Sequence, residues 1–141
     1  MSLVYWDTMV FIYLQEGHPK FGPRVREAYE ALVRRNDTLC TSVFTVGELL
    51  TLPKRMGNDA LVQATRKSML SGEIKILPYT LETAEMYSTI RSRTKLKAAD
   101  AIHLAAAAEA GAGLFVTNDD QLRKIAMPGI PLIVGLDGKI F

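Results

Sequence analysis

Leu3-Val4-Tyr5-Trp6-Asp7-Thr8 is the stretch that decides the fold, because a short apolar run ends directly on a carboxylate and a hydroxyl. Such a run is too short for a helix and lacks polar alternation, which indicates a strand buried on both faces of a parallel sheet. Leu114–Val116 and Leu132–Val134 repeat the pattern later in the chain. We therefore expect these segments to be strands of one covered parallel sheet.

Weaker signals complete the predicted sheet and place helices between its strands. Residues 38–41 form one further strand and residues 74–77 another, in which Lys75 between two isoleucines is typical of an edge strand. Helical patterns occur at about residues 10–16, 23–35, 43–52, 58–69, 81–92 and 98–109. The third helix is expected to begin after a Ser42 cap and to end at Pro53.

These alternating elements predict an α/β protein. Parallel strands need long right-handed crossovers, so the economical architecture is a three-layer α/β/α sandwich with helices on both faces. The length of 141 residues fits one domain spanning residues 1–141.

The composition excludes several classes of protein. An apolar content of 48% and a formal net charge of +2 are typical of a chain that folds without a partner. No apolar stretch reaches the roughly 18 to 20 residues of a membrane span, and no basic start precedes an uninterrupted apolar run. We expect a cytoplasmic protein with no membrane contact. The single cysteine, Cys40, excludes an internal disulfide and a multi-cysteine metal site, and its neighbours indicate burial.

Carboxylates follow two of the expected strands, at the edge where open parallel sheets bind ligands. Asp7 follows the first strand and Asp119 the fourth. The two become neighbours if the first strand is central and the strand order reverses beside it. The alternative for each is a cap on the next helix, a common role of aspartate, and Asp120 is equally able to cap.

Two more carboxylates lie on apolar faces of expected helices. Glu48 follows Phe44 by one helical turn, and Asp100 precedes Leu104 by one turn. An ionised carboxylate in such surroundings costs several kcal/mol unless a cation or a hydrogen-bond donor meets it. The alternatives are a Glu48 side chain that turns to solvent and an Asp100 that interacts with the helix dipole.

A convergence of these four carboxylates would require a cation. They would repel one another in a common pocket unless a divalent ion lay among them. Hard oxygen ligands without a set of His or Cys favour Mg²⁺ or Mn²⁺ over zinc. Such an ion can activate water and stabilise the charge that builds on a phosphate. The pattern therefore predicts hydrolysis of phosphodiester bonds.

Four motifs carry a family resemblance. They are Asp7-Thr8 after the first strand, Ser42 with Glu48 six residues later, Asp100-Ala101-Ile102-His103-Leu104-Ala105, and Thr117-Asn118-Asp119. In this order they resemble the motifs of PIN-domain nucleases, and the chain is similar to VapC-type ribonuclease toxins of type II toxin–antitoxin pairs over residues 3–134. The resemblance implies a five-stranded sheet in the order 3-2-1-4-5.

The resemblance also implies roles for individual residues. Asp7, Glu48, Asp100 and Asp119 would hold one or two Mg²⁺ or Mn²⁺ ions for the cleavage of RNA, which leaves a 5′-phosphate and a 3′-hydroxyl. Thr8 and Thr117 would orient the carboxylates. A homodimer and a small antitoxin protein are the implied partners. Met9 departs from the family, which usually has a small polar residue at this position.

Basic residues precede Asp100 in a run without acidic residues: Arg91, Arg93, Lys95 and Lys97. They are expected either to contact RNA phosphates or to form a solvated loop. His103 follows three residues after Asp100 and is predicted to be a packed histidine with a satisfied ring nitrogen, outside the catalytic set.

Two other functions fit part of the pattern. A catalytically inactive PIN-like interaction module would keep the fold without turnover. An aspartate-dependent phosphatase would use Asp7 as its nucleophile, but it needs a second acid where Met9 stands.

Overall fold

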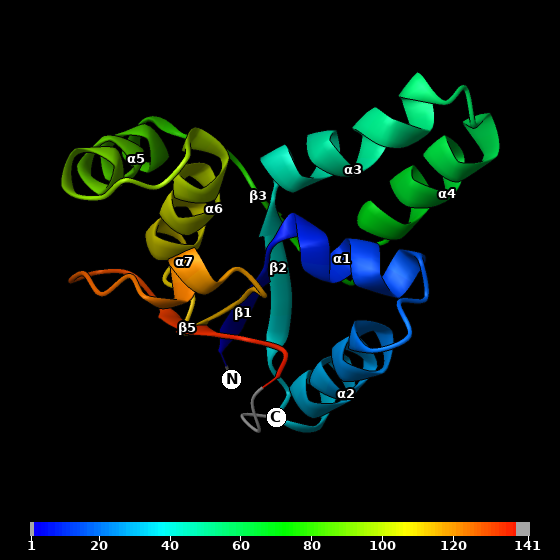
Figure 1. Ribbon diagram of the computed structural model, residues 1–141, viewed down its shortest axis with the longest axis horizontal. Helices are drawn as coiled ribbons and strands as arrows, with labels where there is room; N and C mark the ends of the chain where they lie inside the picture. Colours follow the sequence, from blue (N-terminus) through cyan, green and yellow to red (C-terminus); the bar gives the residue numbers. More distant parts are fainter. Residues whose placement is uncertain (1, 138–141) are drawn as a thin grey trace.

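A five-stranded parallel sheet forms the centre of the structure, a computed structural model that describes residues 2–137 (Figure 1). The central strand is β1 (Leu3–Trp6), flanked by β2 (Thr38–Ser42) and β4 (Leu114–Val116). The edges are β3 (Lys75–Leu77) and β5 (Leu132–Val134), which gives the order β3-β2-β1-β4-β5. The predicted strand order and the edge position of residues 74–77 are therefore confirmed.

Helices cover both faces of the sheet, because the central strands alternate their apolar side chains between the two faces. From β1, Trp6 packs into one buried cluster and Tyr5 into the other. The first cluster lies beneath α1 (Thr8–Gln15), α2 (Phe21–Arg34), α3 (Val43–Arg55) and α4 (Asp59–Met69). The second lies beneath α5 (Leu81–Arg93), α6 (Ala98–Glu109) and α7 (Asp120–Arg123), on the other side of the sheet in Figure 1. This is the predicted α/β/α sandwich.

The predicted end of the third helix is wrong. α3 does not end at Pro53 but continues to Arg55, with the buried Pro53 in its last turn. A proline this close to a C-terminus removes one helical hydrogen bond and leaves the first three turns intact. α7 has no counterpart among the predicted helices, because a helix of four residues shows no period in the sequence.

The composition predicts a buried cysteine and no membrane span, and the structure bears on both. Cys40 is fully buried in β2, and burial raises the pKa of its thiol to about 12, which disfavours the reactive thiolate. Within residues 2–137, no helix is both long enough and apolar enough to cross a bilayer.

Candidate active site

Asp7 lies at the junction of β1 and α1, where it meets the end of β4. Its backbone N–H donates to the carbonyl of Val116 over 3.3 Å. The carboxylate uses its two oxygens differently: Oδ1 accepts from the N–H of Val10 and caps α1, whereas Oδ2 accepts from the hydroxyl of Thr117 at 2.5 Å. Asp7 therefore caps α1 with one oxygen and contacts Thr117, just after β4, with the other.

A cavity of about 280 Å³ opens beside this junction. Three of the four predicted carboxylates line it, each from a different element: Asp7 from the end of β1, Glu48 from α3 and Asp100 from α6. Thr8, Met9 and His103 are also in the lining. The sheet and the helices thus bring residues from distant parts of the chain to one hollow.

Asp119 does not line this cavity. It caps α7, and its Oδ1 accepts from the N–H of Gln121 over 2.8 Å. Its negative charge nevertheless contributes to a raised pKa of Asp100, so the two carboxylates are within electrostatic reach. Asp120 is an exposed residue that forms an ion pair with Arg123 at 3.3 Å. Of the two adjacent aspartates, Asp119 is the one that is coupled to the cavity.

Burial and mutual repulsion destabilise the ionised forms of two carboxyl groups. Burial raises the pKa of Asp7, and the charge of Asp100 adds to the rise, against hydrogen bonds that favour ionisation. Burial also raises the pKa of Asp100, followed by the charge of Asp119 and, to a smaller extent, that of Glu48. A cation placed among these groups would reverse the imbalance.

Glu48 differs from the two aspartates. Partial burial raises the pKa of its carboxyl, but hydrogen bonds from His103 and Thr8 outweigh burial, and the pKa lies below its ordinary value. The hydroxyl of Thr8 and Nε2 of His103 both reach the same atom, Glu48 Oε1, the latter over 2.8 Å. Glu48 is therefore ionised and held in place by side chains of this chain.

His103 is the residue of the site that the sequence interpretation leaves out. It is only 4% exposed, as expected of a packed histidine, but it also lines the cavity. Its Nδ1 lies 2.7 Å from the hydroxyl of Tyr5, and burial raises the pKa of that hydroxyl to about 12. In a neutral ring, donation from Tyr5 to Nδ1 leaves the ring proton on Nε2, which faces Glu48.

The donor set of the cavity fits a hard divalent cation. Its carboxylate oxygens are ligands that Mg²⁺ and Mn²⁺ prefer. Across residues 2–137, no three His, Cys, Asp or Glu side chains are gathered closely enough to form a complete protein cage. An ion held here would therefore need water molecules to complete its coordination, as Mg²⁺ commonly does.

The predicted basic cluster lies at the end of α5 and in the connection to α6, and its four side chains are exposed. The guanidinium of Arg91 donates to the hydroxyl of Tyr87 over 2.9 Å. Lys97 directly precedes α6, and its charge lowers the pKa of Asp100, opposing the larger effects of burial and of Asp119. One end of the cluster is therefore close to the carboxylates.

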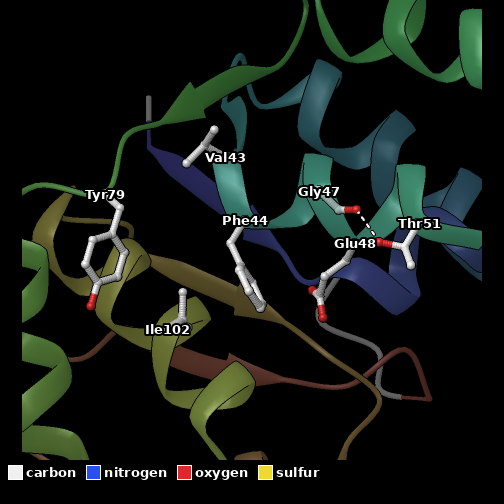
Figure 2. A pocket seen from close by; sticks show the side chains of 7 residues that line it. All are labelled: Val43, Phe44, Gly47, Glu48, Thr51, Tyr79 and Ile102. Carbon is white, nitrogen blue, oxygen red and sulfur yellow. Dashed lines mark hydrogen bonds between the residues drawn. The ribbon is translucent and has the colours of Figure 1, made fainter. Parts of the chain in front are cut away.

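A second, larger hollow of about 520 Å³ adjoins the first and is mostly apolar (Figure 2). Its lining residues are Val43, Phe44, Gly47, Glu48, Thr51, Tyr79 and Ile102. Glu48 lines both hollows, and the ring of Phe44 meets the ring of His103 edge to face, with 5.4 Å between centroids. The two hollows are thus neighbours across one wall.

The sequence of the chain matches one family profile. The profile describes the PIN domain, and it matches residues 4–127. No curated protein matches the chain significantly.

Solved structures include similar chains. One is from the VapBC2 complex of Rickettsia felis bound to a DNA fragment of its promoter, with a TM-score of 0.77, 18% identity, and coverage of 94% of this chain and 98% of that one. Another is from the DNA-bound VapBC of Salmonella typhimurium, with a TM-score of 0.75, 21% identity, and coverage of 96% and 99%. A third is VapC20 of Mycobacterium tuberculosis, described as a sarcin–ricin loop cleaving toxin, with a TM-score of 0.67, 16% identity, and coverage of 84% and 92%. At such identities the similarity shows a shared fold.

Proposed function

The chain belongs to the PIN domain family, and from this premise we propose that it is an endoribonuclease that hydrolyses RNA phosphodiester bonds with Mg²⁺ or Mn²⁺. The observation that carries the proposal is the single cavity lined by Asp7, Glu48 and Asp100. The similar fold of VapC20, which is described as cleaving the sarcin–ricin loop, supports RNA as the substrate class. We treat residues 1–141 as one such domain.

Each side chain of the cavity has a separate task in this proposal. Asp7 and Asp100 would hold the ion, since their ionised forms have the most to gain from it, and Asp119 would add charge from the adjoining α7 cap. A bound ion would supply positive charge for the phosphate and would polarise a water molecule. Thr117 orients Asp7 through Oδ2, while Thr8 and His103 fix the carboxylate of Glu48.

A phosphatase mechanism receives no support from the cavity. An aspartyl-phosphate enzyme needs a second acid two residues after its nucleophile, and Met9 lines the cavity there with 44% of its surface exposed. The thioether has no proton to give to a leaving group. We therefore retain the nuclease, with an inactive PIN-like interaction module as the alternative.

The central test is metal-dependent cleavage. We expect the purified chain to cut members of a panel of transfer, ribosomal and messenger RNAs when Mg²⁺ or Mn²⁺ is present, and to stop when a chelator removes the ion. Gel analysis with end labelling would detect products that carry a 5′-phosphate. Cleavage that survives chelation would contradict the metal role, and failure to cut any RNA would favour the inactive module.

We further propose a toxin role with two protein contacts. The chain would act in the cytoplasm as a homodimeric VapC-type toxin, held inactive by a small antitoxin. Support comes from the shared fold with chains of VapBC complexes from Rickettsia felis and Salmonella typhimurium. A basic antitoxin side chain would suit the cavity, since arginine matches carboxylates with two parallel hydrogen bonds.

The basic cluster is expected to contact RNA phosphates. Replacing Arg93 and Lys95 together with alanine should weaken RNA binding and flatten its salt dependence, because each phosphate contact on a single strand contributes about −0.7 to the slope of log K against log salt. Fluorescence anisotropy with Ca²⁺ at several salt concentrations would measure the slope. Replacing Arg66 and Lys67 together with alanine, which removes two charges on the exposed side of α4, is the matched control. Equal slopes in all three proteins would make the cluster a solvated loop.

A further inference from the structure

We propose that the apolar hollow beside Glu48 binds one unstacked nucleobase of single-stranded RNA, next to the phosphodiester bond that is cleaved. This inference rests on the proposed nuclease function and adds a substrate subsite to it. Three features support it: the apolar lining of the hollow, Gly47 inside α3, and the wall that the hollow shares with the carboxylate cavity.

Two aromatic side chains, Phe44 and Tyr79, line the hollow. Tyr79 stands in the connection between β3 and α5 with 46% of its surface exposed, and in the described part of the chain its ring stacks on no other ring. Figure 2 shows Tyr79 and Phe44 on different sides of the hollow, with Ile102 between them. Proteins bind splayed-out bases of single strands by stacking them on such side chains.

Gly47 is a second feature of the hollow that suits a flat ligand. It lies inside α3, where glycine destabilises a helix relative to alanine. A Cβ atom built at this position would meet nothing within 4 Å, and its backbone does not adopt a positive φ. Neither packing nor conformation within the chain therefore calls for glycine. Its missing side chain leaves bare helix backbone in the wall of the hollow, where a flat ring can approach closely.

Because the hollow adjoins the carboxylate cavity, a base of the RNA substrate is the occupant that fits it best. The hollow and the carboxylate cavity share Glu48, and Phe44 touches His103, which lines the cavity. A base seated here would leave its own phosphate at the carboxylate cavity. Lys97, whose charge acts on Asp100, adds positive charge near that phosphate. A nucleotide therefore fits both parts of this surface: its base fits the apolar hollow, and its phosphate fits the carboxylate cavity with a bound cation and Lys97.

The test combines protein variants with an RNA that lacks single bases. For an RNA that the protein cleaves, kcat/KM is measured on the intact strand and on a series with one abasic position each. We expect Tyr79→Ala to lower kcat/KM about 10-fold on the intact RNA, within the usual effect of one stacked base, and Tyr79→Phe to restore most of it. One abasic position beside the cut should lower the wild-type value equally and cause no further loss in Tyr79→Ala.

Gly47→Ala distinguishes a binding role from a structural one. The added methyl group should raise the melting temperature by strengthening α3, yet it should lower kcat/KM on the intact RNA. Leu70→Ala, which removes a more exposed apolar side chain outside both hollows, is the control for Tyr79→Ala. Additive losses at every abasic position would overturn the subsite. So would sedimentation showing that Tyr79→Ala separates a dimer into monomers. A wild-type protein that cuts no RNA would instead refute the nuclease function.

Discussion

Asp7→Asn is expected to reduce metal-dependent RNA cleavage by more than about 100-fold, because even groups one step removed from a metal commonly contribute 10- to 100-fold. The same change should make the metal-free protein more resistant to heat. Asparagine keeps the cap on α1, since Asn and Asp cap helices equally well. It removes a buried negative charge that the fold disfavours until a cation arrives, and with it the acceptor oxygen that Thr117 meets.

The stabilisation should depend on pH with a definite sign. Because burial raises the pKa of Asp7, the folded chain holds the proton more tightly than the unfolded chain. The free energy of unfolding of the wild type therefore falls as the pH rises from the ordinary value of 3.8 through the raised folded pKa. The advantage of Asp7→Asn should be absent below the ordinary value, grow as the pH rises, and be full above the raised folded pKa.

Thermal melts in chelator and in Mg²⁺ would measure both parts of this prediction. Mg²⁺ should raise the melting temperature of the wild type and have a much smaller effect on Asp7→Asn. A variant that is both inactive and less stable at neutral pH would indicate that Asp7 serves the fold and not a cation. Full cleavage by a well-folded Asp7→Asn would remove Asp7 from the catalytic set.

His103→Leu is expected to lower cleavage by about 10- to 100-fold, the usual cost of losing a group that orients a metal ligand. Leucine removes the donor to Glu48 Oε1 and leaves only Thr8 to hold that carboxylate. It also leaves the hydroxyl of Tyr5 without its His103 partner, which costs about 1 to 3 kcal/mol of stability. In the proposed mechanism His103 would therefore be a positioning residue that acts through Glu48.

A glutamine at position 103 tests this role. Its side-chain amide can donate to Glu48 as Nε2 does, so His103→Gln should recover part of the activity that His103→Leu loses. The Mg²⁺ concentration for half-maximal cleavage should rise in His103→Leu, with kcat falling more than KM changes. Tyr5→Phe, which frees the tautomer of His103 without stranding a hydroxyl, should have a smaller effect. Equal activity of Gln and Leu variants, each assayed well below its melting temperature, would reduce His103 to a packing residue.

The central strand was predictable because burial on both faces produces a continuous apolar run. Leu3–Trp6 reads as continuous apolar sequence since Trp6 and Tyr5 supply different clusters on opposite faces. The end of α3 was not predictable from Pro53, because its cost depends on how many hydrogen bonds follow it. Local sequence shows the proline but not its distance from the helix end.

The carboxylates of the candidate site were predictable because Asp7 follows a strand and Glu48 and Asp100 lie on apolar faces of helices. Three carboxylates line one cavity, but Asp119 does not: it lies at the start of α7, and only its charge acts on Asp100. The contacts of His103 were not predicted, because its spacing from Asp100 gives its position within α6 only. Its partners, Tyr5 and Glu48, belong to other elements, and only the tertiary fold brings them within reach.

The contact between Asp7 and Thr117 joins positions 110 residues apart, and β1 lies between a strand made early and one made late. On the ribosome, β1 can pair with β2 long before β4 has left the exit tunnel, while Asp100 and Thr117 are still to come. A nascent chain therefore carries Asp7 and Glu48 without the other half of the cavity. If the chain is the nuclease proposed above, its own messenger and the translating ribosome meet a complete hydrolytic centre only after β4 has been made and has joined the sheet.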